Sequence, residues 1–502
     1  MNRKISIALV VILMLSLLVS CGEGNVKTEE QSPVASGTSS TAPVSTEDPN
    51  ERKFIEDSLP DDIDFGGETI KIYCRTALEP HITVPEKIED IINDAIYDRI
   101  ERVKERLNIE VETVPVGANK GEAYNGVKNV IKAGSDQMDL AFLNPFGGTF
   151  NLAMEGALIN LSDYTDIIDF DKPWWSEAYR QYSSLNEEAN FIATGHSSQS
   201  FITFGTGLAL NTTLYEDKIG DVSDLYKQIL DGKWTLDAFK TMLKDSYEDL
   251  NGDGAEDEND IYGHYTTMNG LTANGLAIAF GVQYTANNEE NIPELCLNST
   301  KSVEIVDKLT ELFYNTDGFY LTKEATQTAF DSRFTKFKEG TALTTFNYIQ
   351  HMTQFRDMED DYSMIPYPKY DEEQEEYRTY LSPDIAVWMI PTICDDPERA
   401  ASFLEAFSSD SYNYVTPQIY ETAFKEAYSR DPMMGRMLDI IVNSQYTDFG
   451  LLHSELITGL YNFLAGEVLN TSSNNFVSAY SKKEDSWNTA LQGIIEQYQL
   501  SE

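Results

Sequence analysis

Cysteine, histidine and basic residues are scarce in this sequence, and each shortage argues against a class of function. Among 502 residues only four are cysteine and five are histidine, and they are dispersed, so no metal cluster or catalytic triad is visible. Lysine and arginine number 37 against 83 acidic residues, which gives a formal net charge of −46. This excess argues against nucleic acid as a partner, because nothing would neutralise its phosphates.

Signatures of catalysis are missing as well. The chain has no HExxH, no P-loop and no GxSxG, and Gly195-His196-Ser197 lacks the closing glycine. With 83 carboxylates, a pair of acids for glycoside hydrolysis can be imagined anywhere, so no such pair is evidence. The sequence therefore predicts that the protein is not an enzyme, and a surface carbohydrate enzyme is the less favoured alternative.

The first residues read as an export signal followed by a tether. Residues 1–20 carry Arg3 and Lys4 and then an apolar run that is short for a membrane span. Leu18-Val19-Ser20-Cys21 matches the lipobox of bacterial lipoproteins, which implies cleavage before Cys21 and its lipidation. Residues 21–53 are rich in Ser, Thr, Pro and Gly and lack aromatic residues until the folded part begins, as is typical of a disordered linker. We expect an exported protein that touches the membrane only through its lipid anchor.

The remaining cysteines are Cys74, Cys296 and Cys394. Three cysteines cannot all pair, and none has a metal-binding spacing. Buried thiols are the favoured interpretation, and one disulfide with one free thiol is the alternative.

The rest of the chain, about 430 residues, is too long for one core and suits two lobes. Alternating residues predict strands over 68–73 and 109–114, and apolar steps of three and four predict helices over 88–107 and 125–133. A buried strand over 140–143 follows, and a strand over 200–210 is broken by glycines. The alternation of strand and helix predicts an α/β lobe with a mostly parallel sheet.

Several segments resemble one known family. These are QMDLA at 137–141, LAMEGALINLSDY at 152–164, KPWW at 172–175, GKWT at 232–235 and FKEGTAL at 337–343. They are similar, in order, to segments of the maltose-binding-protein-like lipoproteins, the extracellular solute-binding proteins of ABC sugar importers. The resemblance implies a two-lobed α/β fold of the periplasmic-binding-protein type II, each lobe a mixed, mostly parallel sheet flanked by helices, joined by a hinge.

The resemblance also implies domain bounds and partners. Lobe 1 would comprise residues 66–204 and about 384–430, and lobe 2 residues 205–383 and about 431–502. The chain would cross near Gly205-Thr206-Gly207 and again near Tyr377 to Asp384. We expect a monomer that captures a sugar or oligosaccharide by hinge closure and passes it to an ABC permease; a peptide or another polar solute is the alternative ligand.

Aromatic and polar residues near strand ends are the candidate ligand contacts. Sugars have apolar C–H faces and polar edges, so their sites combine flat rings with hydrogen-bonding groups. The candidates are Asp139, Asn144, Trp174, Trp175, Phe346, Asn347, Tyr348 and Trp388. For Trp175 and Trp388, a place in the core is an equally good interpretation.

One acidic loop has the spacing of a calcium site. Oxygen-bearing side chains fall at positions 1, 3, 5, 9 and 12 of a twelve-residue stretch, with glycine at position 6. The predicted ligands are Asp249, Asn251, Asp253, the carbonyl of Ala255, Asp257 and Asp260. A shorter Asp260 replaces the usual glutamate at position 12, which would weaken binding. We expect structural Ca²⁺, and a solvated acidic loop is the alternative.

Overall fold

The structure is a computed structural model that describes residues 54–134, 138–186, 188–322, 326–382, 384–420 and 431–500. The predicted signal, Cys21, the linker to residue 53 and Pro383 lie outside the described residues. What is described belongs to one compact unit, Lys53–Glu502. Within these ranges, no helix combines the length and the apolar character needed to cross a membrane.

The first sheet has four short strands in the order β12-β3-β1-β2. They are β1 (Glu68–Cys74), β2 (Ile109–Pro115), β3 (Leu140–Leu143) and β12 (Val387–Met389). Strand β1 runs parallel to β2 and β3, whereas β12 pairs antiparallel with β3. Parallel pairing therefore predominates, and the carboxyl ends of three strands lie at one edge.

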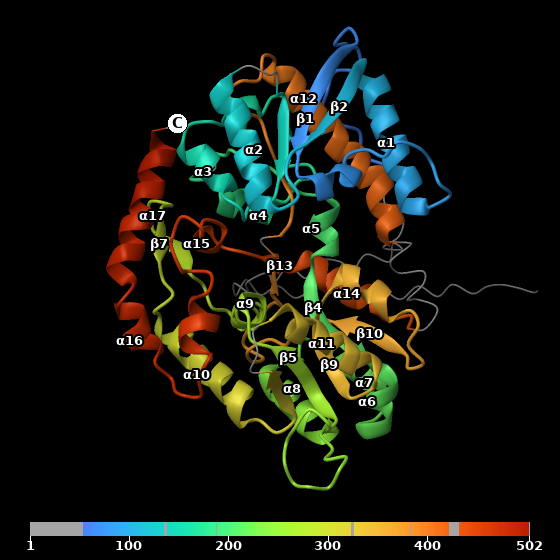
Figure 1. Ribbon diagram of the computed structural model, residues 1–502, viewed down its shortest axis with the longest axis vertical. Helices are drawn as coiled ribbons and strands as arrows, with labels where there is room; N and C mark the ends of the chain where they lie inside the picture. Colours follow the sequence, from blue (N-terminus) through green and yellow to red (C-terminus); the bar gives the residue numbers. More distant parts are fainter. Residues whose placement is uncertain are drawn as a thin grey trace, which may run out of the picture. The chain divides into compact units, whose positions relative to one another are not determined.

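Side chains of the first sheet alternate between two cores. Ile72 and Phe142 enter a core shared with α1 (Ile91–Leu107) and α12 (Pro397–Asp410). Tyr73 and Leu143, each one position further along its strand, enter the other core with α2 (Lys120–Ala133) and α3 (Thr149–Met154). Because successive strand residues point to opposite faces, helices cover both faces of this sheet (Figure 1).

The second sheet has the order β10-β4-β9-β5-β8. Its strands are β4 (Thr206–Asn211), β5 (Tyr262–Thr267), β8 (Phe319–Thr322), β9 (Ala342–Tyr348) and β10 (Tyr362–Ile365). Strand β5 pairs parallel with β8 and β9, and β4 pairs antiparallel with β9 and β10. The sheet is mixed, and one edge gathers the end of β9 and the start of β4.

Helices surround the second sheet and continue to the end of the described chain (Figure 1). The other α-helices whose bounds the structure describes are α4 (Glu177–Ser183), α5 (Gln199–Thr203), α6 (Thr212–Lys218), α7 (Val222–Leu230), α8 (Leu236–Ser246), α9 (Gly270–Ala279), α10 (Thr300–Asn315), α11 (Gln327–Lys338), α14 (Met434–Asn443), α15 (Phe449–Leu452), α16 (Phe476–Ser481) and α17 (Glu484–Gln499). Two small sheets pair β6 (Thr285–Asn287) with β7 (Pro293–Leu295), and β11 (Thr379–Tyr380) with β13 (Gln445–Tyr446).

The structure corrects one predicted strand. Residues 200–210 were expected to be extended, but Gln199–Thr203 form α5, and β4 begins only at Thr206. The apolar residues of this short stretch suit a helix as well as a strand, and over so few residues periodicity does not separate the two.

The three cysteines of the folded part, Cys74, Cys296 and Cys394, are free thiols. Cys74 and Cys394 are buried and Cys296 is half-buried, and burial raises the pKa of each thiol to about 12. They therefore stay protonated and unreactive at neutral pH, as the first of the two interpretations predicted.

A buried glutamate fixes the tryptophan pair of the first lobe. Glu405 of α12 is fully buried, and its Oε2 accepts hydrogen bonds from Nε1 of Trp174 (3.2 Å) and Trp175 (3.0 Å). Its other carboxyl oxygen has no partner. Burial raises the pKa of Glu405 to about 7, although the two indole donors oppose the rise. The folded protein therefore favours the protonated carboxyl group.

We expect Glu405→Gln to flatten the pH dependence of stability. A raised pKa in the folded state means that this contribution is complete below pH 4.5 and is lost as pH rises through about 7. At about 1.4 kcal/mol per pKa unit, the loss reaches about 3 kcal/mol. Denaturant unfolding of wild type and variant across this pH window measures it.

The matched control is Glu398→Gln, an exposed glutamate of the same helix. It should keep the wild-type profile. Burial also raises the pKa of Asp448, to about 6, but that group is present in every protein compared and cancels. If the free energy of unfolding of wild type and of Glu405→Gln changed with pH in the same way, Glu405 would not have a raised pKa in the folded protein.

Candidate functional site

Asn144 ends the central strand of the first sheet at its carboxyl edge. It is buried, and its Nδ2 donates to the carbonyl oxygen of Asp384 at 2.6 Å, while its Oδ1 has no partner. Lys120, the first residue of α2, pairs with the carboxylate of the same Asp384. These two residues therefore fix the segment that returns from the second sheet to β12.

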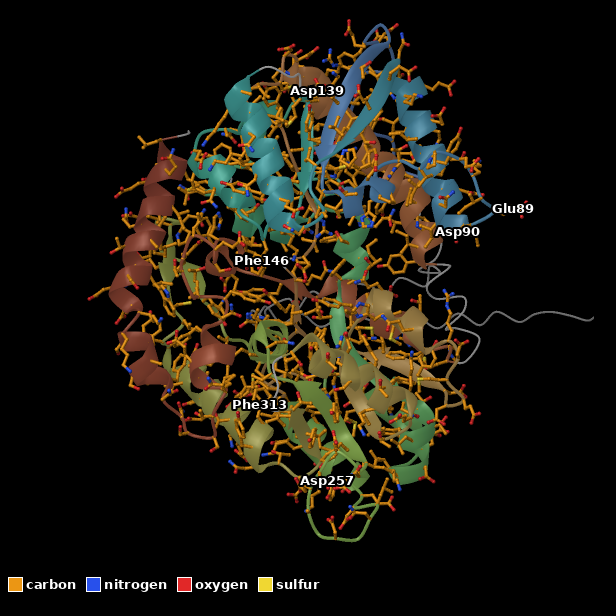
Figure 2. All side chains as sticks on the ribbon, in the orientation of Figure 1. Glu89, Asp90, Asp139, Phe146, Asp257 and Phe313 are labelled. Carbon is orange, nitrogen blue, oxygen red and sulfur yellow. The ribbon has the colours of Figure 1, made fainter. Side chains whose placement is uncertain are left out.

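The loop after Asn144 contacts the C-terminal part of the chain. Gly147 and Gly148 have φ angles of 115° and 99°, which glycine adopts without strain. Their N–H groups donate to Oε1 and Oε2 of Glu455 at 2.8 and 2.6 Å. The rings of Phe146 and Tyr461 meet edge to face, with centroids 4.9 Å apart; Figure 2 labels Phe146 between the two sheets. A charge-assisted pair and an aromatic contact thus hold this loop.

Tyr348 ends β9 at the edge of the second sheet. It is paired with Thr206, the first residue of β4. The hydroxyl of Tyr348 lies 3.3 Å from Oγ of Ser382, and Oγ1 of Thr206 donates to the carbonyl of Tyr380 at 3.1 Å. Both contacts reach the segment that leads to β12, so the edge of the second sheet and the two crossings meet at Tyr348.

Aromatic rings surround Tyr348. Its ring meets those of Phe204, Phe346 and His351 edge to face, at centroid distances of 5.1, 5.4 and 5.3 Å. The ring of Phe334 contacts His351 at 5.3 Å. The side chains are closely packed in this structure, and Tyr348 is 4% exposed.

A fully buried arginine, Arg333 of α11, lies among the same rings. Its guanidinium carbon is 3.4 Å from the ring centroid of Phe330 and 3.9 Å from that of Phe334. Nε donates to the carbonyl of Phe346 at 3.1 Å and Nη1 to that of Phe330, but Nη2 has no partner. We call Arg333, Phe330, Phe334, Phe346, Tyr348 and His351 the Arg333 cluster.

Burial shapes the charges of the Arg333 cluster. Desolvation lowers the pKa of Arg333 to about 9, so the group stays cationic at neutral pH. Desolvation also lowers the pKa of His351 to about 4, and the charge of Arg333 adds to that shift. The cluster thus holds one positive charge beside a neutral imidazole.

Comparison with known proteins gives structural matches alone. No family model matches the chain, and no curated protein matches it in sequence. An ABC-transporter solute-binding protein of Thermotoga lettingae, bound with alpha-D-tagatose, is 14% identical; the match covers 85% of this chain and 100% of that one, with a TM-score of 0.50. The maltose-binding protein MalE of Listeria monocytogenes, in complex with maltose, is 13% identical over 86% of this chain and 98% of that one, with a TM-score of 0.51.

A third match is UspC of M. tuberculosis, with 10% identity, 84% and 100% coverage and a TM-score of 0.52. The chain has the fold of the ABC-transporter solute-binding proteins. The predicted fold class, a two-lobed α/β type II binding protein, is confirmed at this level.

Within the solute-binding-protein fold, four predicted contacts lie in the core of the first lobe. Trp388 of β12 is fully buried and stacks on Phe142 at 4.1 Å, and Trp174 and Trp175 are held by Glu405. Asp139 lies before β3, at the opposite end of the strand from Asn144, and its Oδ1 accepts from Nη2 of Arg399 at 3.0 Å. For Trp175 and Trp388 this is the core interpretation that the sequence left open, whereas for Asp139 and Trp174 these positions differ from the expected ligand contact.

The other four predicted contacts lie at the facing edges of the two sheets. Asn144 belongs to the first edge, and Phe346 and Tyr348 belong to the Arg333 cluster. Asn347 is fully buried; its Nδ2 lies 3.0 Å from Sδ of Met352, and its Oδ1 has no partner. These residues remain the candidate ligand contacts.

Sequence reasoning missed Arg333, Phe146 and Tyr461. A signal for Arg333 was present, because Phe330, Arg333, Phe334 and Phe337 recur at helical spacing and place the arginine on the apolar face of α11. Phe146 and Tyr461 are over 300 residues apart in sequence, and no local pattern joins them.

The predicted calcium loop connects α8 to β5 and is exposed for most of its length. Its side chains accept hydrogen bonds from the loop backbone: Asp249 from the N–H groups of Gly252 and Gly254, Asp253 from Ala255, and Asp260 from Leu250 and Asp257. Across the residues that the structure describes, no three His, Cys, Asp or Glu side chains are grouped so as to hold a metal ion.

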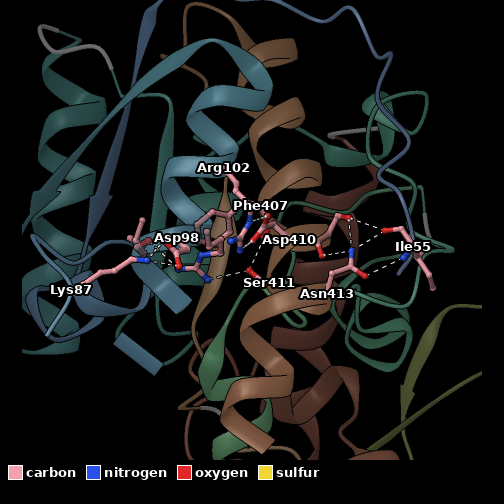
Figure 3. Close-up of polar contacts among 11 residues, drawn as sticks. Ile55, Lys87, Asp98, Arg102, Phe407, Asp410, Ser411 and Asn413 are labelled. Carbon is pink, nitrogen blue, oxygen red and sulfur yellow. Dashed lines mark hydrogen bonds and ion pairs between the residues drawn. The ribbon is translucent and has the colours of Figure 1, made fainter. Parts of the chain in front are cut away.

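A hollow of about 300 Å³ lies elsewhere, between the residues after 53, α1 and α12. Two arginines line it, and each is neutralised: Arg102 binds Asp410 through two 2.7 Å bonds, and Arg106 binds Asp57 at 3.1 Å. Figure 3 shows Asn413 tied to Ile55 on the same wall. With its charges paired internally, this hollow is a weaker candidate than the sheet edges.

Proposed function

We propose that this protein is an exported solute-binding lipoprotein that captures a sugar or an oligosaccharide and delivers it to the permease of an ABC transporter. The proposal rests above all on the aromatic residues gathered at the facing edges of two sheets in a solute-binding-protein fold. Binding pockets prefer such junctions between lobes. Two of the matched proteins are described as bound to tagatose and to maltose.

Capture would work by closure of the two sheets on the ligand. Contacts such as Phe146 with Tyr461, and Glu455 with the amides of Gly147 and Gly148, bridge the first edge and the C-terminal segment. A ligand that touches both edges only when they are together stabilises the closed state by its differential affinity. This cycle of capture and delivery needs only binding and release of the ligand, and no covalent bond is made or broken.

A peptide or another polar solute is the second candidate ligand. The observation that favours it is the positive charge of Arg333 among the rings, since a neutral sugar needs no buried cation. Hydrogen bonds and aromatic faces alone serve a neutral sugar.

We expect neutral or acidic oligosaccharides, and not dipeptides, to raise the melting temperature. A ligand at one hundred times its Kd adds about 2.7 kcal/mol of stability. Tyr348→Ala should reduce the ligand-induced shift and weaken affinity by about tenfold, because it removes the ring at which both crossings meet. Thermal unfolding and titration calorimetry measure the two effects.

The control is Tyr314→Ala, a tyrosine on the exposed side of α10. Its ligand-induced shift should equal that of wild type. A panel of sugars that leaves the wild-type melting curve unmoved, with a shift from dipeptides instead, would reverse the assignment of ligand class.

The lipid anchor is part of the proposal, although Cys21 lies outside the described residues. We expect Cys21→Ala to move the protein from the membrane to the soluble fraction without changing its unfolding curve, because the acyl chains would be its only hold on the bilayer. Cell fractionation compares the variant with Cys296→Ala, which should stay with the membrane. Equal membrane retention of Cys21→Ala would show that the anchor lies elsewhere.

Calcium is proposed as a structural ion of the loop Asp249–Asp260. The spacing of its oxygen-bearing residues supports this, as do its two glycines with positive φ, Gly252 and Gly254. We expect EDTA to lower the melting temperature of wild type, and Asp253→Ala to remove that sensitivity.

The control is Asp307→Ala on α10, which removes the same charge from an exposed site outside the loop. It should keep the response to EDTA. Identical melting curves of wild type with and without EDTA, and no calcium by elemental analysis, would leave a solvated acidic loop.

A further inference from the structure

The cationic group of Arg333 lacks a carboxylate partner in an acidic protein. The sequence has 83 acidic residues, yet among the described residues the side chain of Arg333 donates only to main-chain carbonyls, and Asp331 is the one carboxylate that acts on its charge. The other fully buried arginine, Arg99, also donates to neutral oxygens, those of Ser411, His81 and Ile82, and its Nε has no partner; it lies outside the Arg333 cluster. Burying a charge is costly unless it is paired and hydrogen-bonded.

Two of the three guanidinium nitrogens of Arg333 donate hydrogen bonds, and the third does not. Nε and Nη1 bind main-chain carbonyls of β9 and α11, which fixes the plane of the guanidinium group. Nη2 is buried and has no partner. Nδ1 of His351, in the same cluster, is also buried without a partner. The guanidinium plane of Arg333 is thus fixed, and Nη2 of Arg333 and Nδ1 of His351 are both free to bind a group from outside this chain.

The position belongs to the edge where the ligand is expected. The ring of Tyr348 contacts those of His351 and Phe346, and its hydroxyl lies 3.3 Å from Oγ of Ser382 in the crossing segment. The rings of Phe330 and Phe334 flank the guanidinium and exclude water from it. In such surroundings an oxyanion gains a charge-assisted hydrogen bond that water does not weaken.

We propose that the ligand is an acidic carbohydrate, and that its carboxylate binds Nη2 of Arg333 while Tyr348 contacts the sugar. This deepens the proposed function and rests on it. A carboxylate fits better than a phosphate, because one amino group of one cation is available. The imidazole of His351 is neutral, so a phosphate dianion would remain half-neutralised.

The first test uses wild-type protein and needs no substitution. Titration calorimetry compares oligomers of galacturonate, glucuronate and mannuronate with their methyl esters, and with neutral maltotriose and glucose 6-phosphate. We expect at least one uronate oligomer to bind, and its methyl ester to bind about tenfold or more weakly, as loss of a hydrogen bond to a charged group requires.

The second test changes the arginine. Arg333→Gln should bind the uronate no better than wild type binds the ester, while Arg436→Gln, at an exposed arginine of α14, should match wild type. If Arg333→Gln fails to fold, the comparison of acid with ester in wild type decides alone.

The outcomes separate the two proposals. Equal affinity for maltotriose and for every uronate overturns the acidic ligand but leaves a sugar-binding protein. Tighter binding of glucose 6-phosphate than of any uronate replaces carboxylate by phosphate. Binding of dipeptides in place of all sugars overturns the proposed function together with this inference.

Discussion

The candidate site depends on two segments that pass between the sheets and are bonded to each other. The first enters β4 at Thr206, and the second leaves the second sheet through Tyr380 and Ser382 to reach β12. Oγ1 of Thr206 donates to the carbonyl of Tyr380, and Oγ of Ser200 accepts from the N–H of Ala386. These hydrogen bonds hold the two segments together. The second segment therefore lies in a fixed position between Asn144, at the edge of the first sheet, and Tyr348, at the edge of the second.

Much of the fold could be predicted from the periodicity of apolar residues, as one strand and one helix illustrate. The strand over 140–143 was predicted to the residue because a run of apolar side chains ends at Asn144-Pro145. The helix expected from residue 88 starts at Ile91, because the side chain of Asp90 accepts from the N–H of Asn93 and caps it there. Local rules of this kind carry information because they involve near neighbours in sequence.

The site was only half predictable, for a different physical reason. Trp388 stands on a strand whose two faces are both covered by helices, so alternation does not identify a face that a ligand reaches. The pairing of Phe146 with Tyr461 is set by tertiary packing alone. Arg333 follows the helical spacing of the apolar face of α11, although charged residues usually lie toward solvent. A charge that breaks such a pattern is informative because its burial needs a partner.

The C-terminal helix has a mechanical consequence for how the sheets separate. Trp487, near the start of α17, donates to the carbonyl of Thr458, whereas Tyr498, near its end, donates to the carbonyl of Ser183 and contacts His453. The helix is thus a strut fixed at one end to the first lobe and at the other to the C-terminal segments. Any movement that separates Ser183 from the C-terminal segments would have to break the hydrogen bond of Tyr498, so α17 favours the arrangement in which the two are together.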